Sequence, residues 1–424
     1  MAAENGASTM ELINRGLARR YRKERWFRRC GLGAVIVTIG FLGILFGSIV
    51  VNGWSAFEQA EILLKVHFDP AMFDVDNLAA ADYGGLVKKS LQRMFPEVKD
   101  RRDKRKLNKL ISIGAAFILQ NHIIHDTSLI GKTLKIWLPV DDEVDMFLKG
   151  YIRRDVPESE RRLTDQQIGW IDRLVAGGLL KEKFNTTFFT AGDSREPELA
   201  GIHGAVAGSF FTLIVTLTLS FSIGAATAVY LEEFAPRNRW TDFIEVNINN
   251  LAAVPPIIFG LLGLAVFLNF FNMPRSSPLV GGLVLTLMTL PTIIITSRAS
   301  LKSVPSSIRE AAFAIGASKM QAIIHHILPL AMPGMMTGTI IGMAQALGEA
   351  APLLMIGMVA FIADVPHGFT DPATVLPVQI YLWADAPARA FVERTSAAIM
   401  VLLALLISMN GLAVFLRKKF ERPR

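Results

Sequence analysis

The sequence predicts an all-α integral membrane protein with six transmembrane helices and an external domain inserted between the first two of them. Its composition supports this fold class, because 51% of the 424 residues are hydrophobic and only 19% are charged, which is too apolar for an ordinary soluble protein. The net charge is +7, but the basic residues lie beside apolar segments instead of forming one face interleaved with aromatic residues. A nucleic-acid partner is therefore not expected.

The first predicted transmembrane helix is the uncharged run of residues 31–51, which follows a basic segment, residues 1–30. A run of this length spans the roughly 30 Å hydrocarbon core of a bilayer. It is longer than the apolar part of a secretory signal peptide, so we expect an uncleaved anchor. The excess of arginine before it places residues 1–30 in the cytoplasm.

Residues 52–201 have mixed charge and contain no run long enough to span a membrane. We expect one compact domain here, outside the cytoplasm, because a single crossing precedes it. The apolar stretch Leu110–Leu119 is short and predicts a buried helix of that domain. The tripeptide at 131–133 (GKT) is not a phosphate-binding loop, since Asp126 stands where the motif requires its first glycine.

Five further spans are predicted by apolar length, and together they form a membrane domain over residues 202–416. Six crossings return the basic tail, residues 417–424, to the cytoplasm, and the basic loop around Arg309 and Lys319 falls on the same side. All three basic regions therefore agree on one orientation. The five spans are residues 204–231, 249–271, 279–299, 333–361 and 394–416.

The stretch 306–329 lies between two of these spans and predicts two short helices. Ser307 with Glu310, and Ser318 with Gln321, have the spacing of capping boxes at helix N-termini. Gly316 lies between the two helices, where a residue tolerant of positive φ is favoured. We expect Pro329 to end the second helix because proline cannot continue the hydrogen-bond ladder.

This stretch resembles the EAA loop of ABC-importer permeases. The matching residues are Glu310, Ala311, Ala312, Gly316, Leu328 and Pro329. The resemblance implies that these residues dock on an ATPase subunit and couple its closure to movement of the transmembrane helices. It also implies a type I ABC-importer permease core.

Two other segments resemble phosphate permeases of the PstA type. GEAAPLL (348–354) is similar to their GETAPLL run, and VPPIIFGLLGL (254–264) to their VPSIVFGL segment. The resemblance covers roughly residues 203–416. It implies the permease subunit of an ATP-driven phosphate importer in the bacterial inner membrane.

The same resemblance implies a set of partners. They are two copies of an ATP-binding subunit, a second homologous permease subunit and a periplasmic phosphate-binding protein. ATP and Mg²⁺ would bind the ATPase partner, and no cofactor is expected on this chain.

The intramembrane polar residues form a candidate substrate pathway, because charge inside a span is costly and usually functional. Arg298 follows a series of threonines that includes Thr292 and Thr296, although it would also reach the cytoplasmic interface as a lipid anchor. Glu349 lies one helical turn beyond Gln345, so the two are expected to share a helix face. A structural hydrogen bond between helices is an equal alternative for Glu349.

No catalytic constellation appears in the sequence, so we expect a permease subunit and not an enzyme. The adjacent His325 and His326 have poor spacing for a metal site. Glu393 and Arg394, which open the last span, are expected to be an interfacial anchor. Two other functions remain open: a permease for another oxyanion such as sulfate or molybdate, and a membrane-anchored sensor with an external domain.

Overall fold

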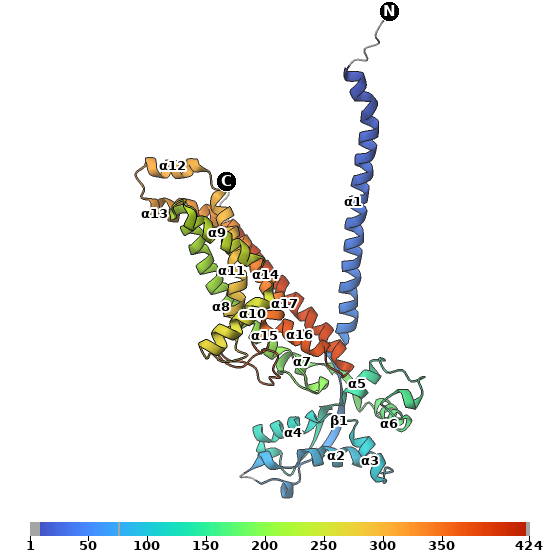
Figure 1. The fold of residues 1–424 in the computed structure, drawn as a ribbon. Coiled ribbons are helices and arrows are strands. Elements are labelled where there is room, and N and C mark those ends of the chain that lie inside the picture. The colour runs from blue at the N-terminus through green and yellow to red at the C-terminus, as the bar shows by residue number, and fades with distance from the viewer. Residues whose placement is uncertain (1–8, 75–76, 421–424) are drawn as a thin grey trace, which may run out of the picture. The chain divides into compact units, whose positions relative to one another are not determined.

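The computed structural model describes residues 9–74 and 77–420 (Figure 1). The chain divides into two units, Met1–Asn52 and Gly53–Arg424. The first unit consists of the helix α1 (Thr9–Gly53), which contains the predicted anchor without a break. From Arg19 onward this helix is long and apolar enough to cross a membrane, as the sequence predicted.

The second unit begins with a region that contains a three-stranded antiparallel sheet, so the prediction of an all-α fold is wrong there. The sheet has the order β2-β1-β3, with Leu64 opposite Ile136 and Ala60 opposite Glu182. Alternate residues of the central strand are buried, which is the period of a strand with one face on a core. The strands are β1 (Glu58–His67), β2 (Thr133–Pro139) and β3 (Leu180–Phe184).

Six helices accompany this sheet, and five of them, α2 to α6, share with it an apolar core that includes the fully buried Ile62, Leu91 and Ile171, whereas Phe188 of α7 belongs to a separate core with Trp383 and Phe391. The predicted helix Leu110–Leu119 begins later than expected, because Ile111 forms a β-bridge with Val140. The helices are α2 (Tyr83–Met94), α3 (Arg101–Asn108), α4 (Gly114–His125), α5 (Asp142–Leu148), α6 (Asp165–Ala176) and α7 (Thr186–Thr190). Short 3₁₀ helices occupy Trp54–Phe57, Pro70–Met72, Leu78–Ala80, Thr127–Leu129, Glu158–Glu160 and Pro197–Leu199.

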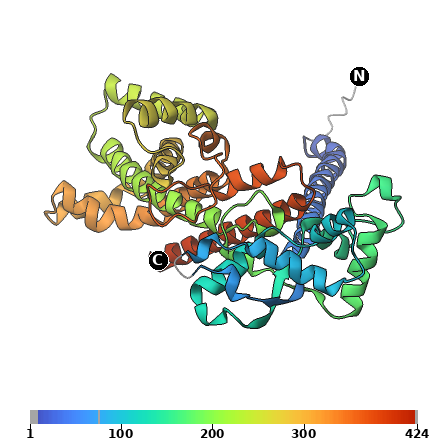
Figure 2. The ribbon, with the colours of Figure 1, turned by 90° about the horizontal axis from the view of Figure 1, so that it is seen from below.

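The rest of the second unit is helical. Seen from below, the blue-green and green residues up to about 200 gather on one side, and helices α9 to α13 lie on the other (Figure 2). Its helices are α8 (His203–Val229), α9 (Arg239–Ala252), α10 (Pro256–Gly263), α11 (Pro278–Lys302), α12 (Ser306–Ala314), α13 (Lys319–Ala322), α14 (Leu328–Gly348), α15 (Ala351–Met355), α16 (Leu376–Ala384) and α17 (Ala390–Phe420). Three π-helical turns, Tyr230–Phe234, Leu264–Phe270 and Ile323–Ile327, extend α8, extend α10 and precede α14.

Small residues let α8, α11 and α14 approach one another closely. A Cβ on Gly282 of α11 would lie 2.5 Å from Val215 Cβ of α8, and Gly338 of α14 faces Thr296 of α11 in the same manner. Such close backbone approach is the usual way in which membrane helices associate. The α8–α11–α14 bundle is therefore the packed centre of the membrane domain.

Among the described residues, five helices are long and apolar enough to span a membrane, and a bent pair would make a sixth span. That pair is α9 and α10 with its π-helical turn, which meet at an angle of 102°. Within the predicted span 249–271, Pro255 and Pro256 break the helix, so this candidate span is a bent pair and not one straight helix. The bent pair still connects the two ends of the bundle (Figure 1).

The predicted span 333–361 is also shorter than expected. Helix α14 ends at Gly348, where Glu349 adopts an extended backbone, and the chain restarts as α15 with Pro352 in its first turn. A proline at that place cannot supply the backbone donor that a continuous helix needs. The segment after Gly348 therefore packs as a separate short helix.

Candidate functional site

Helices α12 and α13 form the predicted pair of short helices between two spans. Gly316 has φ +85°, which confirms the predicted left-handed turn between them. The Ser318 capping box is also confirmed, because Ser318 Oγ accepts from Gln321 N at 3.3 Å and Gln321 Oε1 accepts from Ser318 N at 2.8 Å. The sharp turn is thus built from glycine and one reciprocal cap.

Two predictions about this pair are wrong. Helix α12 already begins at Ser306 after Pro305, so Ser307 lies inside the first turn and makes no cap with Glu310. Pro329 does not end the second helix, since the chain runs from α13 through the π-helical turn into α14 with Pro329 in the first turn. Proline is tolerated at that position because the first-turn N–H groups have no intrahelical partner.

The pair presents an exposed apolar surface. Glu310 and Ala311 are exposed, whereas Ala312 is buried against the chain. Around them lie four exposed large apolar side chains, which we call the docking surface: Phe313, Ile315, Met320 and Ile324. Four exposed large apolar side chains on two adjacent short helices are typical of a protein–protein contact.

Arg309 of α12 fixes α12 and α13, which we call the docking pair, to the membrane helices. Its Nη2 donates to Glu233 Oε1 at 2.7 Å and to the carbonyl of Leu301 at 3.0 Å, and its Nη1 donates to the carbonyl of Val304 at 2.8 Å. Glu233 lies in the π-helical turn after α8, and Leu301 is in the last turn of α11. Sequence analysis missed this link, because the carboxylate and the arginine are 76 residues apart.

Arg298 also lies at this end of the bundle and is already ion-paired. Its guanidinium forms an ion pair with Glu245 of α9, and its Nε lies 3.6 Å from Glu232 Oε2. Lys302 Nζ lies 3.6 Å from the same Glu232 oxygen. The Arg298 side chain is only 15% exposed. In this arrangement Arg298 joins α8, α9 and α11, and its charge is offset by two carboxylates.

The other pathway residues do not gather around Arg298. The hydroxyl of Thr296 donates to the carbonyl of Thr292 at 2.8 Å, so it is satisfied within its own helix. Because Gly338 faces Thr296, the outer end of α14 lies about ten residues, roughly 15 Å, farther along the bundle. Gln345 is near that end of α14, and Glu349 is the first residue after the helix, with an extended backbone.

The two segments that resemble phosphate permeases meet in the fold. A Cβ on Gly260 of α10 would lie 2.6 Å from the carbonyl oxygen of Pro352 and 2.9 Å from Met355 Cβ of α15. Only glycine permits this contact, so VPPIIFGLLGL and GEAAPLL pack as one structural unit beside Glu349.

Glu393 and Arg394 are buried, so the prediction of an interfacial anchor is wrong. Lys149, just after α5, lies 2.7 Å from Glu393 Oε1 and 2.7 Å from Asp145 Oδ2, with all three side chains at most 7% exposed. Ser55 donates to the other oxygen of Glu393 at 2.9 Å. We call Lys149, Asp145 and Glu393 the junction triad, because it ties the sheet-containing region to the first turn of α17.

Two carboxyl groups near the junction have perturbed acidity. Burial raises the pKa of Glu198 to about 7, although Ser112 Oγ donates a 2.6 Å hydrogen bond to it. Burial, followed by repulsion from Asp142, raises the pKa of Asp141 to about 7. Both groups lie outside the spans, so this region takes up protons near neutral pH.

Comparisons with known proteins match the two parts of the chain separately. Residues 220–422 match the model of the binding-protein-dependent transport system inner membrane component family. Residues 14–158 match a domain of unknown function, DUF3333. The family model therefore covers the helical membrane domain that contains α12 and α13.

Three relatives are bacterial permease proteins. The probable ABC transporter permease protein YqgI of Bacillus subtilis is 31% identical over 44% of this chain and 63% of its own length. YqgH of the same organism is 32% identical over 49% of this chain and 68% of its own. The phosphate transport system permease protein PstA 1 of Mycobacterium tuberculosis is 30% identical over 53% of this chain and 73% of its own.

A solved structure of the MetNI methionine ABC transporter, in an inward-facing conformation, is similar to this chain with a TM-score of 0.42 and 19% sequence identity. The match covers 52% of this chain and 97% of the transporter chain. The sequence relatives carry the assignment. The chain belongs to the binding-protein-dependent transport system inner membrane components and is a PstA-like ABC transporter permease.

Proposed function

We propose that this chain is a permease subunit of an ATP-driven importer of inorganic phosphate in the bacterial inner membrane. The observation that carries the proposal is the docking pair, two short helices with a bare glycine turn and an exposed apolar surface, anchored by Arg309 to α8 and α11. The phosphate permease relatives support phosphate as the substrate. Sulfate or molybdate transport is the competing outcome.

In this proposal two ATPase subunits supply the energy, and one of them contacts the docking surface. Closure of the ATPases pushes on α12 and α13, and Arg309 passes the displacement to the ends of α8 and α11. ATP and Mg²⁺ bind the ATPases. A second permease subunit completes the pathway, and an external phosphate-binding protein delivers the anion to the side that carries residues 52–201.

We also propose a role for Arg298 in the anion pathway. A guanidinium holds an oxyanion by charge-assisted hydrogen bonds. In this structure the guanidinium of Arg298 is ion-paired with Glu232 and Glu245. An anion reaches Arg298 only after these ion pairs separate. The role of Arg298 is therefore expected in the state that follows movement of α9 relative to α11.

Uptake of labelled phosphate by cells with and without the gene tests the substrate, with labelled sulfate and molybdate as parallel measurements. Gly316→Val tests the docking pair, because a branched side chain at φ +85° strains the turn by about 1–2 kcal/mol. Gly411→Val is the matched control, since both glycines have open space around a Cβ and only Gly316 has positive φ.

We expect Gly316→Val to abolish phosphate uptake while the protein still inserts, and Gly411→Val to retain it. Equal uptake by the two variants would refute the coupling role. If deletion of the gene abolishes uptake of sulfate or molybdate and leaves phosphate uptake intact, the transported substrate is that other oxyanion. A deletion that changes gene regulation but no uptake would favour the sensor.

A further inference from the structure

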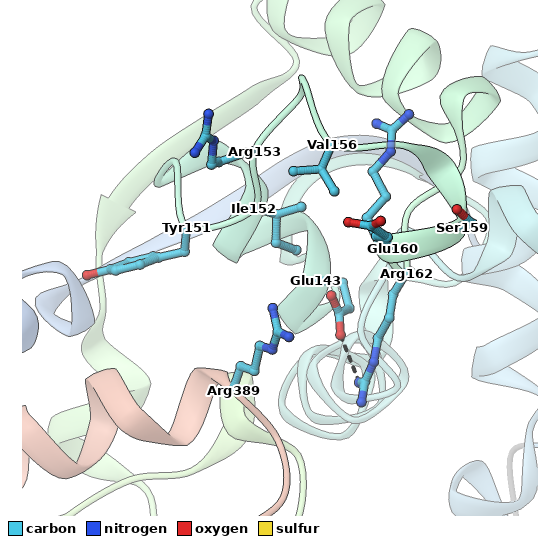
Figure 3. Close-up of a pocket in the computed structure, with 10 residues that line it drawn as sticks. Glu143, Tyr151, Ile152, Arg153, Val156, Ser159, Glu160, Arg162 and Arg389 are labelled. Atoms are coloured by element: carbon cyan, nitrogen blue, oxygen red, sulfur yellow. Dashed lines mark hydrogen bonds and ion pairs between the residues drawn. The ribbon is translucent and has the colours of Figure 1, made fainter.

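The sheet-containing region has a cavity of about 450 Å³ that the proposed transport pathway does not use (Figure 3). It lies between the loop that follows α5, residues 150–162, and Arg389, which immediately precedes α17. Figure 3 shows Arg389 entering from the side of α17, across the cavity from Val156 and Glu160. The lining includes four arginines, Arg153, Arg161, Arg162 and Arg389, and two glutamates, Glu143 and Glu160.

Two of the lining charges have no partner. Arg389 and Glu160 are both exposed, and neither makes a side-chain hydrogen bond or ion pair within the described part of the chain. They face the same cavity with opposite charge and yet do not meet (Figure 3). A ligand that accepts hydrogen bonds at one end and donates one at the other would satisfy both.

Arg161 adds a buried donor to the same wall. Its side chain is only 6% exposed and pairs with Asp165 through the end of the guanidinium. Its Nε is buried and has no hydrogen-bond partner. An unsatisfied buried donor is costly, and a ligand acceptor at this wall would remove that cost.

The remaining arginines form pairs that an anion can displace. Arg153 pairs with Asp155 while both side chains are more than 60% exposed, and Arg162 donates to Glu143 at 2.8 Å with the arginine 71% exposed. Exposed pairs of this kind contribute little to stability. An oxyanion with a charge of −2 competes well for such guanidiniums, because charge-assisted and bidentate contacts are the stronger ones.

We propose that this cavity binds a hydrogen phosphate ion, together with hydration water. Its oxygens accept from Arg389 and Arg161, and its remaining O–H donates to Glu160. The volume exceeds that of one oxyanion, and at about 30 Å³ for each water it has room for a hydrated ion. This inference rests on the proposed function for its choice of phosphate, but the site stands on the cavity itself.

Glu160 makes the site selective. Phosphate retains a proton near neutral pH, whereas sulfate has none to donate and would leave the Glu160 carboxylate facing a second anion. A site that hydrogen-bonds an O–H discriminates strongly against a ligand that lacks it. The cavity therefore prefers phosphate to sulfate, and Glu160→Gln reduces that preference because its amide can donate to either anion.

The test is binding of inorganic phosphate to the purified full-length chain in a maltoside detergent, which contains no phosphate. We expect saturable binding by isothermal titration calorimetry, weakened about tenfold or more by Arg389→Gln. Arg154→Gln is the matched control, because Arg154 is in the same loop but pairs with Asp172 and does not line the cavity. It should bind phosphate as the wild type does.

Absence of saturable binding, or equal binding by Arg389→Gln and Arg154→Gln, would overturn the proposal. If phosphate binds here but cells show no phosphate uptake through this chain, the proposed function fails while the site remains.

Discussion

Replacing Lys149 by methionine isolates the energetic role of the junction triad. The Lys149 ammonium lies 2.7 Å from both Asp145 and Glu393, and every side chain of the triad is at most 7% exposed. Its removal takes away the only cation that forms an ion pair with these two buried carboxylates among the described residues, although the buried Arg394 still interacts with both electrostatically. Breaking a buried pair in this manner costs about 3–5 kcal/mol, mostly through the charge that is left unpaired.

The assay is thermal unfolding of the purified chain in detergent. A loss of about 3–5 kcal/mol corresponds to a fall in Tm of at least about 6 °C for a cooperative unit of 150–250 residues. Arg173→Met is the control, because Arg173 and Glu97 also form an ion pair but their side chains are 65% and 50% exposed. Such a pair contributes about 0–1 kcal/mol.

Adding Glu393→Gln to Lys149→Met should recover part of the lost stability, since it removes one of the two uncompensated charges. Equal Tm values for Lys149→Met and Arg173→Met would refute the reasoning. A double variant that is less stable than Lys149→Met would show that Glu393 acts through packing and not through charge.

Three further predictions follow from other regions. In a Cys30→Ser background, a cysteine at the exposed position Lys89 should react with an impermeant thiol reagent from outside the inner membrane; protection there would reverse the proposed orientation. Arg298→Gln should abolish phosphate uptake and Arg298→Lys should reduce it, measured with labelled phosphate at equal membrane abundance; wild-type uptake by the Gln variant would leave Arg298 a structural role only. Because the folded-state pKa of Glu198 is about 7 against an ordinary 4.5, the folded chain binds more protons there, and this group's contribution to stability falls as pH rises from about 4.5 to 7. Glu198→Gln should flatten that part of the Tm-against-pH curve, and an unchanged slope would assign it to Asp141 or another group.

The long apolar helices and the docking turn could be predicted from sequence because their causes are local. A run of apolar residues fixes a span, and Gly316 with the Ser318 box fixes the turn within a few residues. The bend at Pro255–Pro256 has a local cause as well, because the proline pair interrupts the backbone hydrogen-bond ladder. Apolar length alone extended the predicted span 333–361 past Gly348, where α14 ends.

The sheet and the charged contacts could not be predicted with equal ease. The alternation of buried residues in β1 is a local signal of a strand, but the mixed charge of residues 52–201 and their lack of a membrane-spanning run do not by themselves indicate a sheet. The ion pairs of Arg298 with Glu245, Arg309 with Glu233 and Lys149 with Glu393 join residues that are 53 to 244 positions apart. Lys149 also pairs with Asp145, four positions before it. No spacing rule in a single sequence pairs residues as far apart as the first three pairs.

Helix α17 is held near both of its ends. Glu393 in its first turn belongs to the junction triad, and a Cβ on Gly53 would lie 2.8 Å from Ala397 N, so the backbones touch there. Near its other end, Arg417 Nη1 donates to Thr337 Oγ1 of α14 at 3.3 Å, and α14 continues from the docking pair. The 31 residues of α17 span about 46 Å. A displacement of the sheet-containing region is therefore carried along one stiff helix to α14, so strain at one end of the bundle has a direct mechanical route to the other end.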